Sequence, residues 1–269
     1  MAARRLGAVQ NPDGGFGPRA GAPSEPEPTA LAAIALDDPA ARAWLEANQR
    51  DDGSYGVVDG YVRDEVATGL AALALDPGSA RERALDRLEV LEGAPADPNE
   101  AIPLDVGLLG WPWTRDTFGW VEPTARAVLA LRLLRPGSPR VAGGVALLRD
   151  RRAVGGGWNY GNREVLGQEL PPFAQTTAVA MLALHGLDDE LESEGASALR
   201  RLWREEHTGT ISVALSLVVF RMREEQDEVR AARAALQPLI EDGDPLGDTV
   251  AEAWAVIALG EHVPFREAP

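Results

Sequence analysis

The sequence predicts an all-α protein built from about six helical hairpins. Three observations indicate this fold: short apolar segments rich in Ala and Leu recur along the chain, an amphipathic segment precedes each of them, and Gly-rich turns with an aromatic residue join several of the pairs. Repetition of one supersecondary unit at intervals of this size is typical of repeat architectures. We expect a single domain over residues 1–269, an α/α toroid with an inner and an outer ring of helices.

The apolar segments form the predicted inner ring. They have no polar face, and a helix that is apolar nearly all round is buried on most sides. Most of them begin with a Thr close behind an acid or an amide, and these landmarks are Thr29, Thr68, Thr124, Thr177, Ser212 and Thr249. The predicted inner helices cover residues 27–36, 66–75, 122–131, 174–184, 211–220 and 248–259.

The amphipathic segments form the predicted outer ring. Each has an apolar stripe at helical spacing and a face of Arg and Glu. They cover residues 2–10, 40–49, 80–93, 140–152, 196–207 and 228–242. Short connections favour antiparallel neighbours. An open solenoid is the alternative, but its end helices would be polar on one side, and residues 248–259, with Trp254 and Ile257, are not obviously so.

Three turns between outer and inner helices resemble one another: QNPDGGFG at residues 10–17, QRDDGSYG at 49–56 and GGGWNYG at 155–161. Gly provides the positive φ angles that a tight helix-to-helix turn needs, and the aromatic residue can cover exposed helix ends.

The Pro-rich stretches at residues 17–28 and 92–107 are loops within hairpins, because Pro and Gly interrupt helices. None of them is a linker between domains.

These turns, with helices of the EPTALAAIAL type after them, resemble the QW repeat of terpenoid cyclases and the Gly-Gly-aromatic turn of protein prenyltransferase β subunits. The resemblance covers nearly the whole chain as a pattern and is clearest at residues 10–75 and 120–187. It implies a toroid with an axial cavity, in which glutamine side chains tie neighbouring turns together. Structural roles are therefore expected for Gln10, Gln49, Phe16, Tyr55 and Trp158.

The resemblance also implies that the N-termini of the inner helices surround the mouth of the cavity. Polar residues gather at these positions, namely Glu27, Asp64, Glu65, Glu122, Gln175 and Asp248. Acids at helix N-termini also cap the helix, at about 0.3–1 kcal/mol each, so capping accounts for any one of them alone. As a set they are candidates for chemistry: Asp64, Glu65 and Glu122 as catalytic acids, Gln175 and Asp248 as ligand-binding groups.

Two insertions, residues 108–120 and 159–173, lie at the same end of the hairpins. Loops on a rigid scaffold are frequent sites of binding. Aromatic faces can line an apolar pocket, stabilise a cation or stack on a sugar; alternatively, they fill the core. The candidate ligand-binding residues in or beside these insertions are Trp111, Trp113, Trp120, Trp158, Tyr160 and Arg163.

The motifs that the resemblance would require for catalysis are missing. The chain has no Asp-x-Asp-Asp, the proton-donating motif of terpenoid cyclases. The zinc ligands of the prenyltransferases would fall near Glu122, Thr124 and Gln175, and Thr and Gln are poor zinc ligands. We therefore expect no metal, no cofactor, no protein prenyltransferase activity and no α-subunit partner.

Composition narrows the possible partners further. The chain has no Cys, which excludes disulfides and thiolate chemistry. Its net charge of −16, with Arg as the basic residue in place of Lys, disfavours nucleic acid or an anionic membrane as a partner. No stretch has the roughly 20 apolar residues of a membrane span or the apolar core of a signal peptide. We expect a soluble cytoplasmic protein.

Three functions remain open from the sequence. The first is a small enzyme or binder of the terpenoid-cyclase or prenyl-transferase type, with an isoprenoid or other apolar ligand in the axial cavity. The second is a non-catalytic toroid that acts as a binding or scaffold module. The third is a carbohydrate-active α/α barrel, a lyase or a hydrolase, since paired acids and Trp platforms suit sugars.

Overall fold

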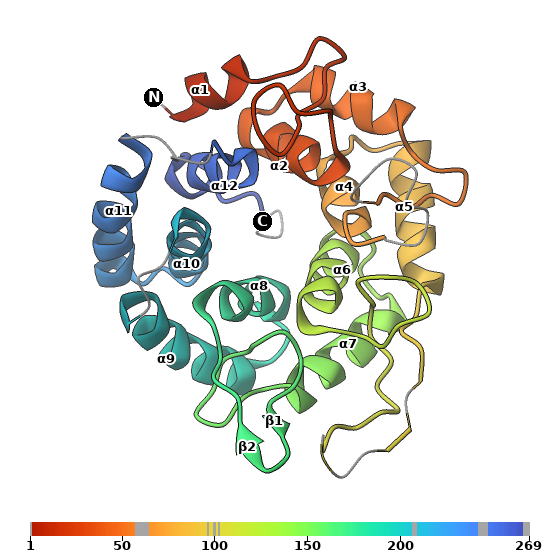
Figure 1. The fold of residues 1–269 in the computed structure, drawn as a ribbon, viewed down its shortest axis with the longest axis vertical. Coiled ribbons are helices and arrows are strands. Elements are labelled where there is room, and N and C mark those ends of the chain that lie inside the picture. The colour runs from red at the N-terminus through yellow and green to blue at the C-terminus, as the bar shows by residue number, and fades with distance from the viewer. Residues whose placement is uncertain are drawn as a thin grey trace. The chain divides into compact units, whose positions relative to one another are not determined.

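The computed structural model describes residues 2–56, 65–95, 97–98, 101, 103–205, 209–241 and 247–265. In these residues the chain forms twelve helices and one two-stranded hairpin, so the prediction of an all-α protein is confirmed (Figure 1). The apolar helices are α2 (Pro26–Leu36), α4 (Thr68–Ala74), α6 (Val121–Leu134), α8 (Ala174–Leu184), α10 (Thr210–Met222) and α12 (Thr249–Leu259). The amphipathic helices are α1 (Ala2–Ala8), α3 (Pro39–Ala47), α5 (Ser79–Val90), α7 (Pro139–Asp150), α9 (Asp189–Glu205) and α11 (Gln226–Glu241).

Burial separates the two kinds of helix as the sequence predicts. Every residue of α8 except Gln175 is buried. In α3, by contrast, only Ala41 and Leu45 are buried, and in α11 only Ala232 and Leu236. Each of these pairs is spaced i,i+4, so it forms one stripe on one face of its helix. The amphipathic helices therefore cover the apolar ones and present their Arg and Glu faces to solvent.

Helix α9 begins earlier than the predicted residue 196. Its first turn contains Asp189 and Glu190, which complement the helix dipole. The Asp188 carboxylate accepts a hydrogen bond of 3.1 Å from the Leu191 N–H. The prediction started too late because apolar periodicity was its criterion, and this end of α9 is defined mainly by acidic residues. The last predicted residues, 206 and 207, lie outside the described part of the chain.

The chain divides into two compact units, one of residues 1–87 and 209–269 and the other of residues 88–208. We refer to them as unit 1 and unit 2. The boundary at residue 87 falls within α5 and not in a Pro- or Gly-rich linker. The single domain that the sequence predicts stays a prediction.

Unit 1 contains both ends of the chain. Its apolar helices form a row in which α10 packs on α12, α12 on α2, and α2 on α4 (Figure 1). The amphipathic α11 packs on α10, and α3 packs on α2. Helix α1 contacts both α2 and α12, and the Arg5 Nε donates to a Glu252 carboxylate oxygen at 2.7 Å. The first and last hairpins of the described chain are thus packed together.

Unit 2 is built from one continuous stretch. Helices α6 and α8 lie side by side, α7 packs on α6, and α9 packs on α8 (Figure 1). The loop before α8 carries the strands β1 (Glu164–Val165) and β2 (Gln168–Glu169), which pair antiparallel. Leu166 and Gly167 connect them with φ angles of 53° and 75°, the backbone of a tight hairpin turn. This small sheet was not predicted from the sequence.

One hydrogen-bonded unit recurs in four hairpins of the described chain. A Thr hydroxyl in the first turns of the apolar helix accepts from the backbone N–H of the turn aromatic, at 2.9–3.0 Å, and donates to the carbonyl of the same residue. The pairs are Thr29 with Phe16, Thr68 with Tyr55, Thr124 with Trp111, and Thr177 with Trp158. Both backbone groups of each buried aromatic residue are satisfied in this way, and buried groups of this kind need such partners.

The side chains of these aromatic residues fix the other side of the turn. The Tyr55 hydroxyl donates to the Leu45 carbonyl in α3 at 2.9 Å. Burial raises the pKa of Tyr55, which keeps its hydroxyl protonated as a donor. The Trp111 and Trp158 indoles donate in the same way to Leu88 in α5 and Leu148 in α7. Tyr55, Trp111 and Trp158 therefore each connect the end of one helix to the start of the next.

The two turn glutamines have the structural role expected from the resemblance. Gln10 donates to the Gly14 carbonyl at 2.9 Å and to the Asp38 carboxylate at 3.0 Å, and Asp38 is the N-cap of α3. Gln49 donates to the Gly53 carbonyl at 3.1 Å and to the Ala80 carbonyl, in the first turn of α5, at 2.8 Å. Each glutamine ties its own turn to the beginning of the next amphipathic helix.

Trp111 belongs to this repeat, which the sequence analysis did not recognise. In three turns a backbone bond closes a loop just before the aromatic residue, as from Asn11 N–H to Gly15 carbonyl. In the remaining hairpin the Gly93 N–H donates to the Gly110 carbonyl at 3.1 Å, so residues 94–109 are inserted into an otherwise standard turn. In three hairpins the aromatic residue, Phe16, Tyr55 or Trp111, stands 13 residues before its Thr. This shared spacing could have identified Trp111 as a turn residue from the sequence.

The first prediction concerns the Thr hydroxyl. Thr29→Val keeps the shape of the side chain but leaves the N–H of buried Phe16 without a partner, and the Phe16 carbonyl keeps only the bond from the Glu25 N–H at 2.9 Å. We expect it to lower the free energy of unfolding by about 1–3 kcal/mol, measured by urea denaturation. Thr29→Ser retains the hydroxyl and should cost less than 1 kcal/mol, about the value of one buried methyl group. Equal losses in both variants would show that packing of the methyl group, and not the hydrogen bonds, is what matters.

The second prediction concerns acid stability. Partial burial acts to raise the pKa of Asp13, but donors on Gly15, Ser24 and Trp44 outweigh it and lower the pKa below its ordinary value of 3.8. A folded-state pKa below the unfolded one contributes stability above the unfolded value, and the contribution is lost as pH falls through the folded value. The stability difference between the wild type and Asp13→Asn should therefore be constant near pH 7 and shrink below pH 3.8. A difference that grows in acid would contradict the assignment.

Candidate functional site

The two insertions of unit 2 are joined at the N-terminal ends of α6 and α8. The Val121 N–H, at the start of α6, donates to the Tyr160 carbonyl at 3.1 Å. A Cβ on Gly161 would lie 3.0 Å from the Trp120 indole, so the Gly161 backbone is stacked closely on that ring. The Phe173 N–H, just before α8, donates to the Trp158 carbonyl at 2.9 Å. The sequence prediction that these insertions lie at one end of their hairpins agrees with this arrangement.

Four aromatic side chains of these loops form two partly exposed pairs, Phe118 with Trp120 and Tyr160 with Phe173, which we call together the aromatic cluster. The rings of Phe118 and Trp120 lie 4.6 Å apart between centroids and tilted by 36°, and those of Tyr160 and Phe173 lie 5.6 Å apart and tilted by 46°. Phe118 is 45% exposed and Tyr160 53%. Exposed aromatic side chains in loops on a rigid scaffold mark a candidate binding surface.

The structure divides the predicted ligand-binding residues into two groups. Trp120 and Tyr160 belong to the aromatic cluster, and Trp113 is half-buried in the same loop. Trp111 and Trp158 are buried in the turns described above. Arg163 donates to the Asp150 carbonyl at 2.7 Å and to the Pro103 carbonyl at 3.0 Å, which fixes its loop to the end of α7. Sequence reasoning missed Phe118 and Phe173, although both stand within or beside the insertions it singled out.

Glu122, a predicted catalytic acid, is bound to an arginine one helical turn away. The Arg126 guanidinium donates to its carboxylate at 2.6 Å, and only 5% of the Glu122 side chain and 10% of the Arg126 side chain are exposed. The pair lies in the first turns of α6, where the carboxylate also complements the helix dipole. In the low dielectric of the interior, each charge needs the other to offset the cost of desolvation.

Glu65, in unit 1, is held in a similar way just before α4. Two Arg87 nitrogens donate to its two carboxylate oxygens, both at 2.6 Å, and its side chain is almost completely buried. Asp52 lies near the same guanidinium, with an oxygen 3.9 Å from Nε. Such a bidentate pair is among the stronger polar interactions in proteins. Asp64, the neighbouring candidate, lies outside the described residues.

The other predicted mouth residues occupy helix starts. Asp248 is the N-cap of α12 and accepts from Val250 and Ala251 at 2.8 and 3.2 Å. Glu27 lies in the first turn of α2, and Gln175 in that of α8. The sequence did not single out Glu25, at the N-cap position of α2. Burial raises the pKa of Glu25, and the charge of Glu27 adds to the effect.

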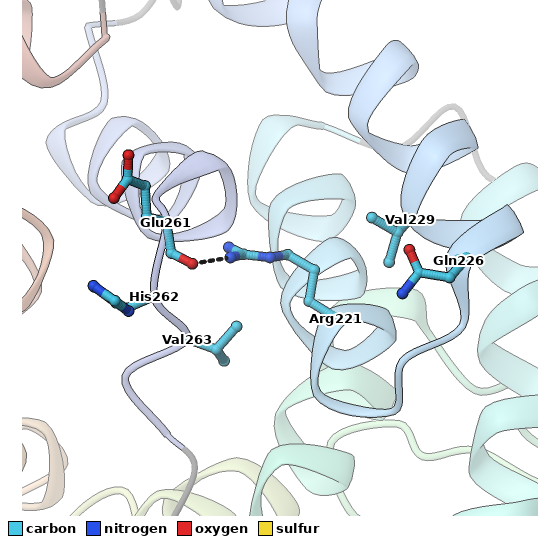
Figure 2. Close-up of a pocket in the computed structure, with 6 residues that line it drawn as sticks. All are labelled: Arg221, Gln226, Val229, Glu261, His262 and Val263. Atoms are coloured by element: carbon cyan, nitrogen blue, oxygen red, sulfur yellow. Dashed lines mark hydrogen bonds between the residues drawn. The ribbon is translucent and has the colours of Figure 1, made fainter.

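Unit 1 has a separate polar hollow of about 390 Å³ at the far end of α10. Figure 2 shows Arg221 reaching from α10 toward the segment that follows α12, with Gln226 and Val229 on the α11 side. The Arg221 guanidinium donates to the carbonyls of Ala258 and Glu261, both at 2.9 Å. Its donors are thus engaged in capping the end of α12, and the hollow surrounds a structural joint.

The described residues contain no group of three or more His, Asp or Glu side chains placed to hold a metal ion. Likewise, none of the helices formed by those residues combines the length and the apolarity that crossing a membrane requires.

No family model and no curated protein matches this chain.

The buried pair on α6 gives a third prediction. Glu122→Gln leaves the Arg126 charge without its carboxylate partner and should lower the free energy of unfolding by about 3–5 kcal/mol. The double variant Glu122→Leu, Arg126→Met removes both charges and should recover most of that loss. Thermal or urea unfolding measures both. Unchanged stability in Glu122→Gln would mean that the carboxylate is not committed to Arg126 and is free for chemistry.

Proposed function

We propose that this chain is an α/α toroid of the terpenoid-cyclase and prenyltransferase type that binds an isoprenoid or other apolar ligand, and that it does so without using Glu65 or Glu122 as catalytic acids. The observation on which the proposal depends is the aromatic cluster at the N-terminal ends of α6 and α8.

The repeated turn supports the fold part of the proposal. Four hairpins share the pairing of Thr with an aromatic residue, and two of them also share the glutamine that ties one turn to the next helix. In unit 1 the last hairpin packs on the first, which a closed ring of hairpins requires and an open solenoid does not.

The exposed aromatic rings support an apolar ligand. Covering a large apolar side chain is worth about 1.5–3 kcal/mol, so two or three such contacts would contribute about 3–9 kcal/mol before the cost of association is subtracted. Leu166 and Leu170, on and beside the β1–β2 hairpin of the same loop, are also exposed. The ring pairs are tilted and not coplanar, which suits a flexible hydrocarbon better than the flat face of a sugar.

The arginine partners support binding without acid catalysis by these two carboxyls. A general acid must hold a proton and release it to the substrate. The Glu65 carboxylate instead accepts two hydrogen bonds from Arg87, and the Glu122 carboxylate accepts one from Arg126. These carboxylate oxygens are thus engaged by arginines in buried ion pairs and are not directed at a ligand.

The fourth prediction tests ligand binding. Native mass spectrometry of the purified protein, with added farnesol, farnesyl diphosphate or a cello-oligosaccharide, should show uptake of at least farnesol. The double variant Phe118→Ser, Tyr160→Ser removes the two most exposed rings of the cluster and should weaken uptake about 100-fold, the equivalent of roughly 3 kcal/mol.

The matched control is Val90→Ser, which removes an exposed apolar side chain of unit 2, 67% exposed, that lies outside the aromatic cluster. It should leave uptake unchanged. No uptake of either isoprenoid would overturn the proposal and favour a scaffold protein. Uptake of the sugar alone would favour the carbohydrate-active alternative. Equal loss in the control and the double variant would place the ligand elsewhere.

A further inference from the structure

A second, smaller cavity lies in unit 2 beside the first turns of α7. None of the four residues of the aromatic cluster lines it. It has a volume of about 250 Å³. Its walls come from the first turns of α7, from the loop that leads to Trp111, and from Glu92 just after α5. The residues used below are Glu92, Leu108, Leu109, Trp111, Arg140 and Gly143. A volume of this size suits a small molecule of one ring more than a ligand of ordinary drug size.

Two neighbouring glycines of α7 differ in the space around them, and the one with open space lines this cavity. A Cβ on Gly144 would lie 2.3 Å from the Val128 side chain and 3.1 Å from Trp111, so Gly144 is needed for α7 to pack against α6. A Cβ on Gly143 would meet nothing within 4 Å. Glycine within a helix lowers helix stability compared with other residues, and packing in the described chain gives no reason for it at 143. Its effect is to leave the wall of the cavity open.

The polar end of the cavity is formed by Arg140. Its guanidinium stacks on the Trp111 ring, 4.4 Å from the centroid, and donates to the Leu91 carbonyl at 2.7 Å and to the Glu92 carboxylate. The Arg140 Nε–H has no acceptor among the described residues. Because Glu92 already balances the charge of Arg140, the site favours a neutral acceptor over an anion. Buried polar groups gain most from a partner where water is scarce.

We propose that this cavity is a binding site for a small, neutral, mainly apolar molecule with one carbonyl group, such as an aromatic or alicyclic amide or ketone. The ring would lie against Leu108 and Leu109 and over the open backbone at Gly143. The carbonyl oxygen would accept from the Arg140 guanidinium. The site is separate from the aromatic cluster, and it does not depend on the isoprenoid proposal.

The experiment uses benzamide as the probe and the full chain, with amide NMR shifts read at residues 107–111 and 140–144. We expect saturable shifts there with a dissociation constant of about 1 mM, as befits so small a ligand. Gly143→Leu fills the cavity and should weaken binding at least about tenfold. It should leave the melting temperature equal or higher, because a Cβ at this position meets no neighbour within 4 Å and leucine favours the helix over glycine. Ala142→Leu, an exposed neighbour on α7 that does not line the cavity, is the matched control and should bind as the wild type does.

Glu92→Gln tests the polar end. Glu92 is half exposed, so the change should leave the fold intact and leave the charge of Arg140 unbalanced. Preference between benzamide and benzoate should then shift toward benzoate by about tenfold. Absence of saturable shifts at these residues in the wild type, or equal affinity in Gly143→Leu and the wild type, overturns the proposal. Unchanged preference in Glu92→Gln overturns the role given to Arg140.

Discussion

A threonine hydroxyl bound to the backbone of a buried aromatic residue is the interaction on which these hairpins depend. The turn must bring one helix end and the next helix start close together, and doing so buries the N–H and the carbonyl of the aromatic residue. The hydroxyl satisfies both groups at once, and the tyrosine or tryptophan side chain then reaches back to the end of the preceding helix. The loop of residues 159–173 tolerates its length because it lies between Trp158 and Thr177, which such a bond holds together.

The pairing of buried carboxylates with arginine is the second interaction that shapes the structure. The chain has no lysine, and the guanidinium of arginine is a planar fork of donors, which fits a carboxylate better than an ammonium group does. Glu65 and Glu122 are two buried carboxylates with such a partner, in different units. Carboxyls that a sequence pattern marks as catalytic are therefore better explained as parts of the framework. The loops add exposed apolar side chains to this framework. These side chains are where the binding of a ligand would take place.

The helices could be predicted because their evidence is local. Apolar and amphipathic segments differ over ten residues, and the predicted 27–36 and 174–184 agree closely with α2 and α8. The partner of Glu122 was also within reach, since Arg126 stands four residues later on the same helical face. The partner of Glu65 was not, because Arg87 lies 22 residues away and the pairing depends on how α4 and α5 meet. The role of Trp111 as a turn residue could not be recognised easily, because a long insertion precedes it. The aromatic cluster could not be predicted, because it forms only when two loops from different hairpins come together.

The packing of the last hairpin on the first determines the order in which the chain can fold. Unit 2 is contiguous, so it can complete its core during synthesis, as soon as residues 88–208 have emerged from the ribosome. Unit 1 cannot, because Arg5 and its partner Glu252 are 247 residues apart. Until α12 is made, the apolar surface of α2 that it covers stays open to solvent and to other chains. Slow translation of the last hairpins therefore prolongs the period in which the nascent protein can aggregate, and a chaperone that covers α2 would act in that interval.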